Sequence, residues 1–167
     1  MESLACVREL ELPDWAIGAG FVRNAVWDHL HGFVKHTALE DVDVLYFNSD
    51  DTEPGSEIPI EECLLEKLPN RNWSVKNQAR MHLRNGDEPY ASTSHAMEYW
   101  LETATCVAAR LEDNDAMSII APFGLSDLLS LKSRPTAAGL RRHDQYIARM
   151  QMKSWSAHWP EVAVKDF

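Results

Sequence analysis

The stretches WAIGAGFVRNAVWDHLHG (residues 15–32) and DVDVLYF (residues 41–47) decide the fold. Residues 15–19 are mainly apolar and run into glycine, which is typical of a buried strand that ends at a turn. From Phe21 to His31 the period changes: Val22, Ala25, Val26 and Leu30 share one side of a helix, and Arg23, Asn24, Trp27 and Asp28 share the other. A strand therefore passes through a glycine turn directly into a helix.

The second stretch predicts a strand with two acidic side chains on one face. Residues 41–47 are rich in β-branched and aromatic side chains. Because side chains alternate along a strand, Asp41 and Asp43 project together while Val42 and Val44 pack behind them. Carboxylates this close repel unless a cation lies between them, and Mg²⁺ or Mn²⁺ binds carboxylate and phosphate oxygens together. Taken alone, the pair equally suits a solvent-facing acidic strand or two salt bridges.

The turn Gly18-Ala19-Gly20 favours the interpretation as a binding site. Glycines between a strand and a helix let the backbone approach a ligand and present N–H groups at the positive helix end, where phosphate binds. Arg23 and Asn24 lie in the first turn of that helix and could hold phosphate oxygens. A phosphate-binding turn and a metal-binding strand together are a more specific signal than either alone.

The rest of the chain alternates between helical and extended patterns, which indicates an α/β or α+β fold with boundaries good to a few residues. Without repeats or a long linker, residues 1–167 are expected to form one domain. Further helices are expected at residues 3–11, 58–68, 78–83, 94–100, 125–131 and about 140–155, and further strands at 73–75, 103–111 and 117–121.

Charge and composition exclude several functions. The formal net charge of −10 disfavours bulk binding of nucleic acid, although residues 131–167 are locally basic, with seven Lys or Arg against Asp144, Glu161 and Asp166. We expect this helical segment, from about residue 132, to be a solvated face that also pairs with the acidic remainder of the chain. No apolar run is long enough to cross a membrane, and the three cysteines form no CxxC pair. These features favour a cytoplasmic protein without a membrane partner.

The motif residues resemble a known family. The order GAG, VRN and DVD is similar to the GG-x-VRD-x-LLG…DxD core of the tRNA nucleotidyltransferase and poly(A) polymerase head domain, with alanine for the second glycine and Asn24 for aspartate. A closer resemblance is to a bacterial nucleotidyltransferase-like family with the pattern W-x-x-GAG-x-x-RN-x-x-WD-x-LHG…DVDV…NQA-x-x-H…ETAT. It is matched here by Trp15, residues 18–20, 23–24, 27–28, 30–32, 41–44 and 77–79, His82 and residues 102–105.

This resemblance implies a polymerase-β-like nucleotidyltransferase palm, a short mixed sheet flanked by helices. It implies Asp41 and Asp43 as catalytic metal ligands and Gly18, Ala19, Gly20, Arg23 and Asn24 as nucleotide-binding residues. An acceptor hydroxyl would attack the α-phosphate of a nucleoside triphosphate in line, with Mg²⁺ or Mn²⁺ stabilising the charge. The expected function is transfer of a nucleoside monophosphate to a small-molecule or protein hydroxyl, since the chain lacks the helical domains with which tRNA-modifying relatives hold RNA.

Two further positions have alternative interpretations. Active members of the superfamily add a third carboxylate on a neighbouring strand, where residues 73–77 offer only Asn77. Asn77 could bind nucleotide or metal, or simply cap the next helix. Glu102 is a further candidate metal ligand, with a structural cap as its alternative. A protein that kept the palm without catalysis, as a nucleotide-binding or protein-interaction module, is the competing function, and a nucleotide-sugar glycosyltransferase ranks behind it.

Overall fold

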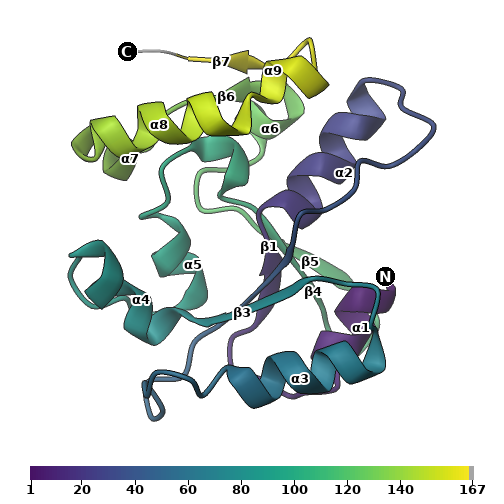
Figure 1. Ribbon diagram of the computed structural model, residues 1–167, viewed down its shortest axis with the longest axis vertical. Helices are drawn as coiled ribbons and strands as arrows, with labels where there is room; N and C mark the ends of the chain where they lie inside the picture. The colour runs from purple at the N-terminus through teal and green to yellow at the C-terminus, as the bar shows by residue number, and fades with distance from the viewer. Residues whose placement is uncertain (166–167) are drawn as a thin grey trace.

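The computed structural model describes residues 1–165 and is built on a five-stranded mixed sheet (Figure 1). The strand order is β3-β2-β1-β4-β5; β2 and β3 are parallel and the other neighbours antiparallel. The strands are β1 (Ala16–Gly18), β2 (Val42–Tyr46), β3 (Trp73–Asn77), β4 (Ala108–Leu111) and β5 (Met117–Ile120). A small parallel pair joins β6 (Lys132–Ser133) to β7 (Ala163–Val164). Asp166, counted in the basic segment above, lies outside the described residues.

Helices cover the sheet and form a further layer from the C-terminal part of the chain (Figure 1). They are α1 (Glu2–Arg8), α2 (Gly20–Leu30), α3 (Ile58–Lys67), α4 (Gln78–Asn85), α5 (Thr93–Met97), a 3₁₀ turn η1 (Thr103–Thr105), α6 (Ser126–Leu129), α7 (Ala137–Arg141), α8 (His143–Lys153) and α9 (Trp155–His158). This is the mixed fold that the sequence predicts, a short mixed sheet flanked by helices.

The side chains of β2 alternate between the two faces of the sheet. Val42 and Val44 are fully buried in a cluster with Ile17, Val75 and residues of α1 and α3. Asp43 and Leu45 point to the other face, where Leu45 packs on Met97 of α5. The predicted in-and-out pattern of this strand is therefore confirmed, and the acidic face is the one turned away from α1 and α3.

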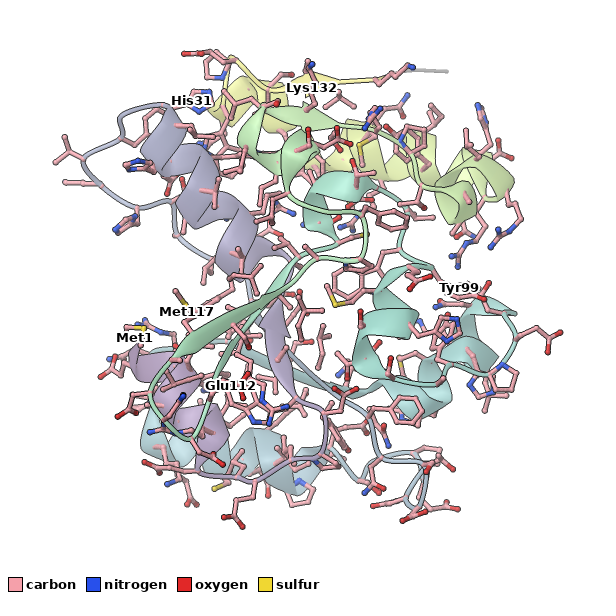
Figure 2. The ribbon with its side chains drawn as sticks, turned by 180° about the vertical axis from the view of Figure 1, so that it is seen from behind. Met1, His31, Tyr99, Glu112, Met117 and Lys132 are labelled. Carbon is pink, nitrogen blue, oxygen red and sulfur yellow. The ribbon has the colours of Figure 1, made fainter. Side chains whose placement is uncertain are left out.

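The β4–β5 hairpin is fastened to the N-terminal helix. Figure 2 shows the hairpin residues Glu112 and Met117 at the same end of the molecule as Met1, away from Lys132. Arg8 of α1 donates a hydrogen bond to the backbone oxygen of Glu112 over 2.9 Å and pairs with Asp115 at 2.8 Å. These contacts fix the edge of the sheet that is far from β3.

The buried side of α2 is its polar side. Arg23, Asn24, Trp27 and Asp28 are buried, whereas Ala25 is exposed. The reason is a tryptophan cluster supplied by the C-terminal helices: Trp27 packs edge-on against Trp155 and Trp159, each with ring centroids 5.3 Å away. Trp27 is therefore a core residue, and its ring nitrogen donates to the backbone oxygen of Leu128.

Three segments differ from the sequence prediction. The expected strand at residues 103–111 begins only at Ala108. Residues 103–105 form the 3₁₀ turn η1 instead, because the Thr105 hydroxyl donates to the backbone oxygen of Glu102. The expected helix at 140–155 is interrupted at Arg142 and again at Ser154, whose φ of 43° is left-handed. The short strands β6 and β7 were not predicted. Within residues 1–165, no helix combines the length and apolarity needed to cross a membrane.

Candidate functional site

The turn between β1 and α2 brings the backbone into an unusual conformation at the head of a cavity. Ala19 precedes α2 with φ 51° and ψ −119°, a conformation that L-residues rarely adopt. Its N–H donates to the Val107 oxygen over 2.9 Å. A β-carbon on Gly18 would lie 2.9 Å from Leu45 Cδ1 and 3.3 Å from Trp100 Cη2, so glycine is needed there for close packing.

Asp43 lies in the same cavity as this turn. Burial, and after it the neighbouring Asp41 charge, raise the pKa of the Asp43 carboxyl to about 6 against the opposing effect of a hydrogen bond from Ser74. Asp41 is exposed just before β2. Among residues 1–165 neither aspartate has a Lys, Arg or His partner within 4.0 Å. The pair therefore remains available to a cation.

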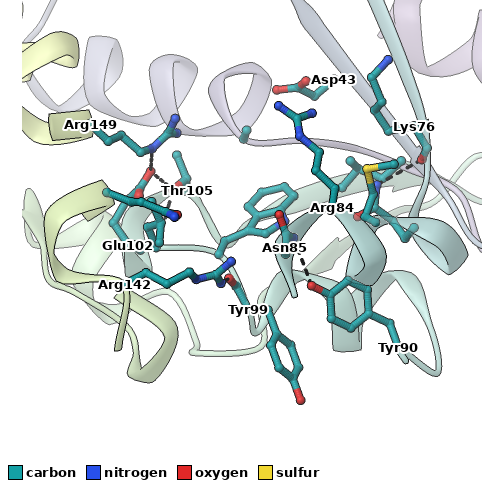
Figure 3. Close-up of a pocket in the computed structure, with 17 residues that line it drawn as sticks. Asp43, Lys76, Arg84, Asn85, Tyr90, Tyr99, Glu102, Thr105, Arg142 and Arg149 are labelled. Atoms are coloured by element: carbon teal, nitrogen blue, oxygen red, sulfur yellow. Dashed lines mark hydrogen bonds and ion pairs between the residues drawn. The ribbon is translucent and has the colours of Figure 1, made fainter. Parts of the chain in front are cut away.

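The cavity has a volume of about 590 Å³ and is drawn in Figure 3. Of the predicted site residues, Ala19, Asp43 and Glu102 line it. The walls come from the strands β2 and β3, from α4, from the segment between α5 and η1, and from α8 with Arg142 just before it. The other lining residues are Leu45, Lys76, Gln78, Met81, Arg84, Asn85, Tyr90, Tyr99, Trp100, Leu101, Thr105, Arg142, Gln145 and Arg149. The sheet and the C-terminal helices thus build the cavity together.

Four cationic side chains that the sequence did not identify as site residues line this cavity. They are Lys76 of β3, Arg84 of α4, and Arg142 and Arg149 from the C-terminal helices. Figure 3 shows Arg84 and Asp43 toward the same side of the cavity. The basic character of residues 131–167 is the one available signal for Arg142 and Arg149, and it predicts a solvated face that pairs with acidic residues. Both arginines do pair with acidic residues, Asp87 and Glu102, but they line the cavity rather than a solvated face.

Arg23 and Asn24 lie behind the glycine turn. Arg23 donates to the Asn24 side-chain oxygen over 2.8 Å and places its guanidinium over the Trp155 ring, 4.6 Å from the centroid. It is 6% exposed, and burial lowers its pKa to about 10, opposed chiefly by the charge of Glu102. A β-carbon on Gly20 would lie 3.5 Å from an Arg23 guanidinium nitrogen, so Arg23 folds back against the turn.

Asn77 is the N-cap of α4. Its side-chain oxygen accepts from the backbone N–H groups of Ala79 and Asn48, and its amide donates to the backbone oxygens of Asn48 and Asp51. All of its polar atoms are engaged within the protein, and it holds residues 48–51 against the start of α4. The capping alternative is therefore what the structure displays.

Glu102 is buried in the wall opposite Lys76. One of its carboxylate oxygens accepts from Arg149 over 2.8 Å and from the Thr105 hydroxyl; the other has no partner among residues 1–165. The structure does not join Glu102 to the aspartates: in the described chain, no group of three or more His, Cys, Asp or Glu side chains is placed to hold a metal ion. Asp41 and Asp43 stand as a pair.

Comparison with known proteins supplies independent findings. A family model described as "Nucleotidyltransferase" matches residues 5–164. A solved structure described as a CCA-adding enzyme head domain is similar over 99% of this chain and 88% of its own, with 31% sequence identity and a TM-score of 0.87. A tRNA-processing enzyme complex gives a TM-score of 0.47 at 19% identity, covering 80% of this chain and 35% of that one. No curated protein matches the chain.

Proposed function

Because this chain belongs to the nucleotidyltransferase family, we propose that it transfers a nucleoside monophosphate from a nucleoside triphosphate to the hydroxyl of a small-molecule or protein acceptor. The acceptor oxygen forms a new bond to the α-phosphorus, the bond to the bridging oxygen breaks, pyrophosphate leaves, and the hydroxyl proton is released. The reaction takes place in the cavity between the sheet and the C-terminal helices. A cytoplasmic location is part of this proposal and accords with the three free cysteines.

One observation carries the proposal: Asp43 and Ala19 of the glycine turn share one cavity with Lys76, Arg84 and Arg149. A triphosphate needs cations around its oxygens, and Lys76, Arg84 and Arg149 supply them beside the turn at which α2 begins. Arg84 has no hydrogen bond or ion pair among residues 1–165, so its five donors are free for phosphate. The proposed triphosphate position therefore lies between the turn and Arg84.

A divalent cation fits the two aspartates. Asp43 lies in β2 and Asp41 just before it, close enough for its charge to act on Asp43; both carry the hard oxygen ligands that Mg²⁺ and Mn²⁺ prefer, and neither has a cationic side chain within 4.0 Å in the described residues. When bound, the metal supplies charge stabilisation for the phosphates. The residues proposed to hold it are Asp41 and Asp43, while Glu102 is engaged by Arg149.

The alternative is a nucleotide-binding or protein-interaction module without turnover. It is favoured by one specific observation, the absence of a third acidic ligand beside Asp41 and Asp43 in residues 1–165. It retains the phosphate and cation contacts described above but predicts no release of pyrophosphate. Binding and turnover therefore separate the two functions.

The test combines thermal unfolding with a pyrophosphate assay. We expect each triphosphate that binds to raise the unfolding temperature of the wild type in the presence of Mg²⁺, by mass action. Asp41→Ala should lose the Mg²⁺-dependent part, whereas Asp113→Ala, an exposed aspartate in the β4–β5 turn, should keep it. Equal shifts in Asp41→Ala and wild type would refute the metal site, and binding without pyrophosphate release would select the module.

A further inference from the structure

The part of the cavity around Arg142 is not explained by the triphosphate. Figure 3 shows Asp43 and Arg84 on one side of the cavity and Arg142 with Tyr99 on the other. Arg142 lies between α7 and α8, donates to the backbone oxygen of Tyr99, and sits 3.6 Å from Asp87. Its Nε is buried and has no hydrogen-bond partner among residues 1–165. Arg142 lines the cavity with its side chain 17% exposed, and its guanidinium has donors beyond the bond to Tyr99 and the ion pair with Asp87.

The groups around Arg142 are polar, and each nearby carboxylate already has an arginine partner. Asn85 donates to the Tyr90 hydroxyl over 3.1 Å, and that hydroxyl donates to Asp87 over 2.6 Å. Glu102, the lining carboxylate on this side, is paired with Arg149. Gln145 adds an amide to the same lining. This wall therefore offers a cation, amide groups and tyrosine rings; its lining carboxylate, Glu102, already has Arg149 as a cationic partner, with one oxygen left without a hydrogen bond among the described residues.

We propose that this wall is the acceptor subsite, and that the acceptor is a small hydroxyl compound carrying an oxyanion group, a phosphate or a carboxylate, bound by Arg142. The inference rests on the proposed function, because it places the second substrate beside the triphosphate. The guanidinium fork matches the oxygens of either oxyanion. The triphosphate is placed on the other side of the cavity, with Asp43 and Arg84, which is why we assign this wall to the acceptor.

The chain as a whole agrees with a small acceptor. Its net charge of −10 repels a polyanion, whereas the cavity is lined by four basic and two acidic side chains. The positive charge is thus confined to the cavity, where a small anion can enter. Cationic acceptors are disfavoured by the same charges.

The experiment measures acceptor binding by calorimetry with the full chain saturated by α,β-methylene-ATP and Mg²⁺. The probes are ribose 5-phosphate and gluconate, with ribose as the neutral match. We expect at least one oxyanion probe to bind about tenfold more tightly than ribose, and Arg142→Gln to abolish the difference. Arg141→Gln, which removes the same charge from the exposed neighbouring residue, should keep it. Arg142→Lys, which retains the charge but not the planar guanidinium, should give an intermediate preference. This variant also keeps the test decisive if Arg142→Gln folds poorly.

The outcomes that overturn the inference differ from those that overturn the proposed function. Equal binding of ribose and both oxyanion probes at millimolar concentration, or equal effects of Arg141→Gln and Arg142→Gln, would eliminate the subsite. Transfer to an RNA 3′ hydroxyl in preference to the small probes would also overturn it. Failure of α,β-methylene-ATP to bind would remove the proposed function, while Arg142-dependent selection of an oxyanion probe would still establish the anion site.

Discussion

At the scale of single residues, the site depends on an alanine in a conformation that suits glycine. Ala19 has φ 51° and ψ −119° at the point where β1 becomes α2. The conformation is fixed on both sides, by its own N–H bond to Val107 and by the bond from the Arg23 N–H to its carbonyl. Strain of this kind costs roughly 1–3 kcal/mol and persists only where the surrounding structure enforces it.

Replacing Ala19 with glycine should therefore stabilise the protein. Relief of strain exceeds the extra entropy of an unfolded glycine, so we expect Ala19→Gly to raise the free energy of unfolding by about 1 kcal/mol. Ala25→Gly provides the opposite control, because Ala25 is exposed in the middle of α2 and should lose about 1 kcal/mol. Urea unfolding of both variants measures the difference. A loss of stability in Ala19→Gly would show that Ala19 is not strained.

Asp43 makes stability depend on pH in a predictable direction. Its pKa is raised from 3.8 to about 6 in the folded state, so the folded protein holds this proton more tightly than the unfolded chain. Below pH 3.8 both states are protonated and the aspartate costs nothing; between pH 3.8 and 6 stability falls, and above pH 6 the cost is complete. We expect Asp43→Asn to be more stable than wild type at pH 8 without metal, by up to about 3 kcal/mol.

The same substitution should make no difference near pH 3, where the carboxyl is neutral in both states. Urea unfolding at pH 3 and pH 8 therefore isolates the contribution of the Asp43 charge. A stability difference that stays constant with pH would contradict the raised pKa. If Asp43 binds Mg²⁺, the variant should also lose the stabilisation that Mg²⁺ and triphosphate give to wild type.

At the scale of secondary-structure elements, α2 shows what the sequence could predict and what it could not. The strand, the glycine turn, the helix and the acidic strand β2 follow from local periodicity, and the structure has all four. The buried side of α2 could not be predicted, because Trp155 and Trp159, distant in sequence, cover its polar side. The break at Ser154 could not be predicted either, because a serine gives no sequence signal of a left-handed backbone.

Arg23 on α2 allows a test that separates folding from binding. It is a buried cation with no carboxylate within 4.0 Å among residues 1–165, and its Nε has no partner there. Arg23→Met should keep the stability of wild type or gain about 1 kcal/mol, because an apolar side chain needs no desolvation. The family resemblance implies that Arg23 binds nucleotide, and Arg23 packs behind the turn, so the variant should nevertheless lose triphosphate-dependent stabilisation.

Arg80→Met supplies the matched control, because Arg80 pairs with buried Glu57 at 2.6 Å. Leaving Glu57 unpaired should cost about 3 kcal/mol. Chemical unfolding with and without triphosphate and Mg²⁺ measures both effects. A large loss of stability in Arg23→Met would identify a purely structural arginine.

At the scale of the whole molecule, the cavity joins parts of the chain that are far apart in sequence. Asp43 and the glycine turn come from the N-terminal half, and Arg142 and Arg149 come from helices near the other end. The acidic strand could be predicted because its two ligands are neighbours in sequence, whereas the arginines could not, because only tertiary packing brings them to the cavity. The local basic charge of residues 131–167 identified the segment without indicating its partner.

Because two distant parts of the chain line this cavity, the protein cannot be shortened without losing one side of it. A shortened protein that ended before α7 would contain every strand of the main sheet and both aspartates, but one side of the reaction chamber would be missing. The acidic motif and the main sheet are therefore not sufficient to form the complete cavity. Chimeras that exchange α7 and α8 between family members should consequently exchange acceptor preference while the nucleotide chemistry stays with the sheet.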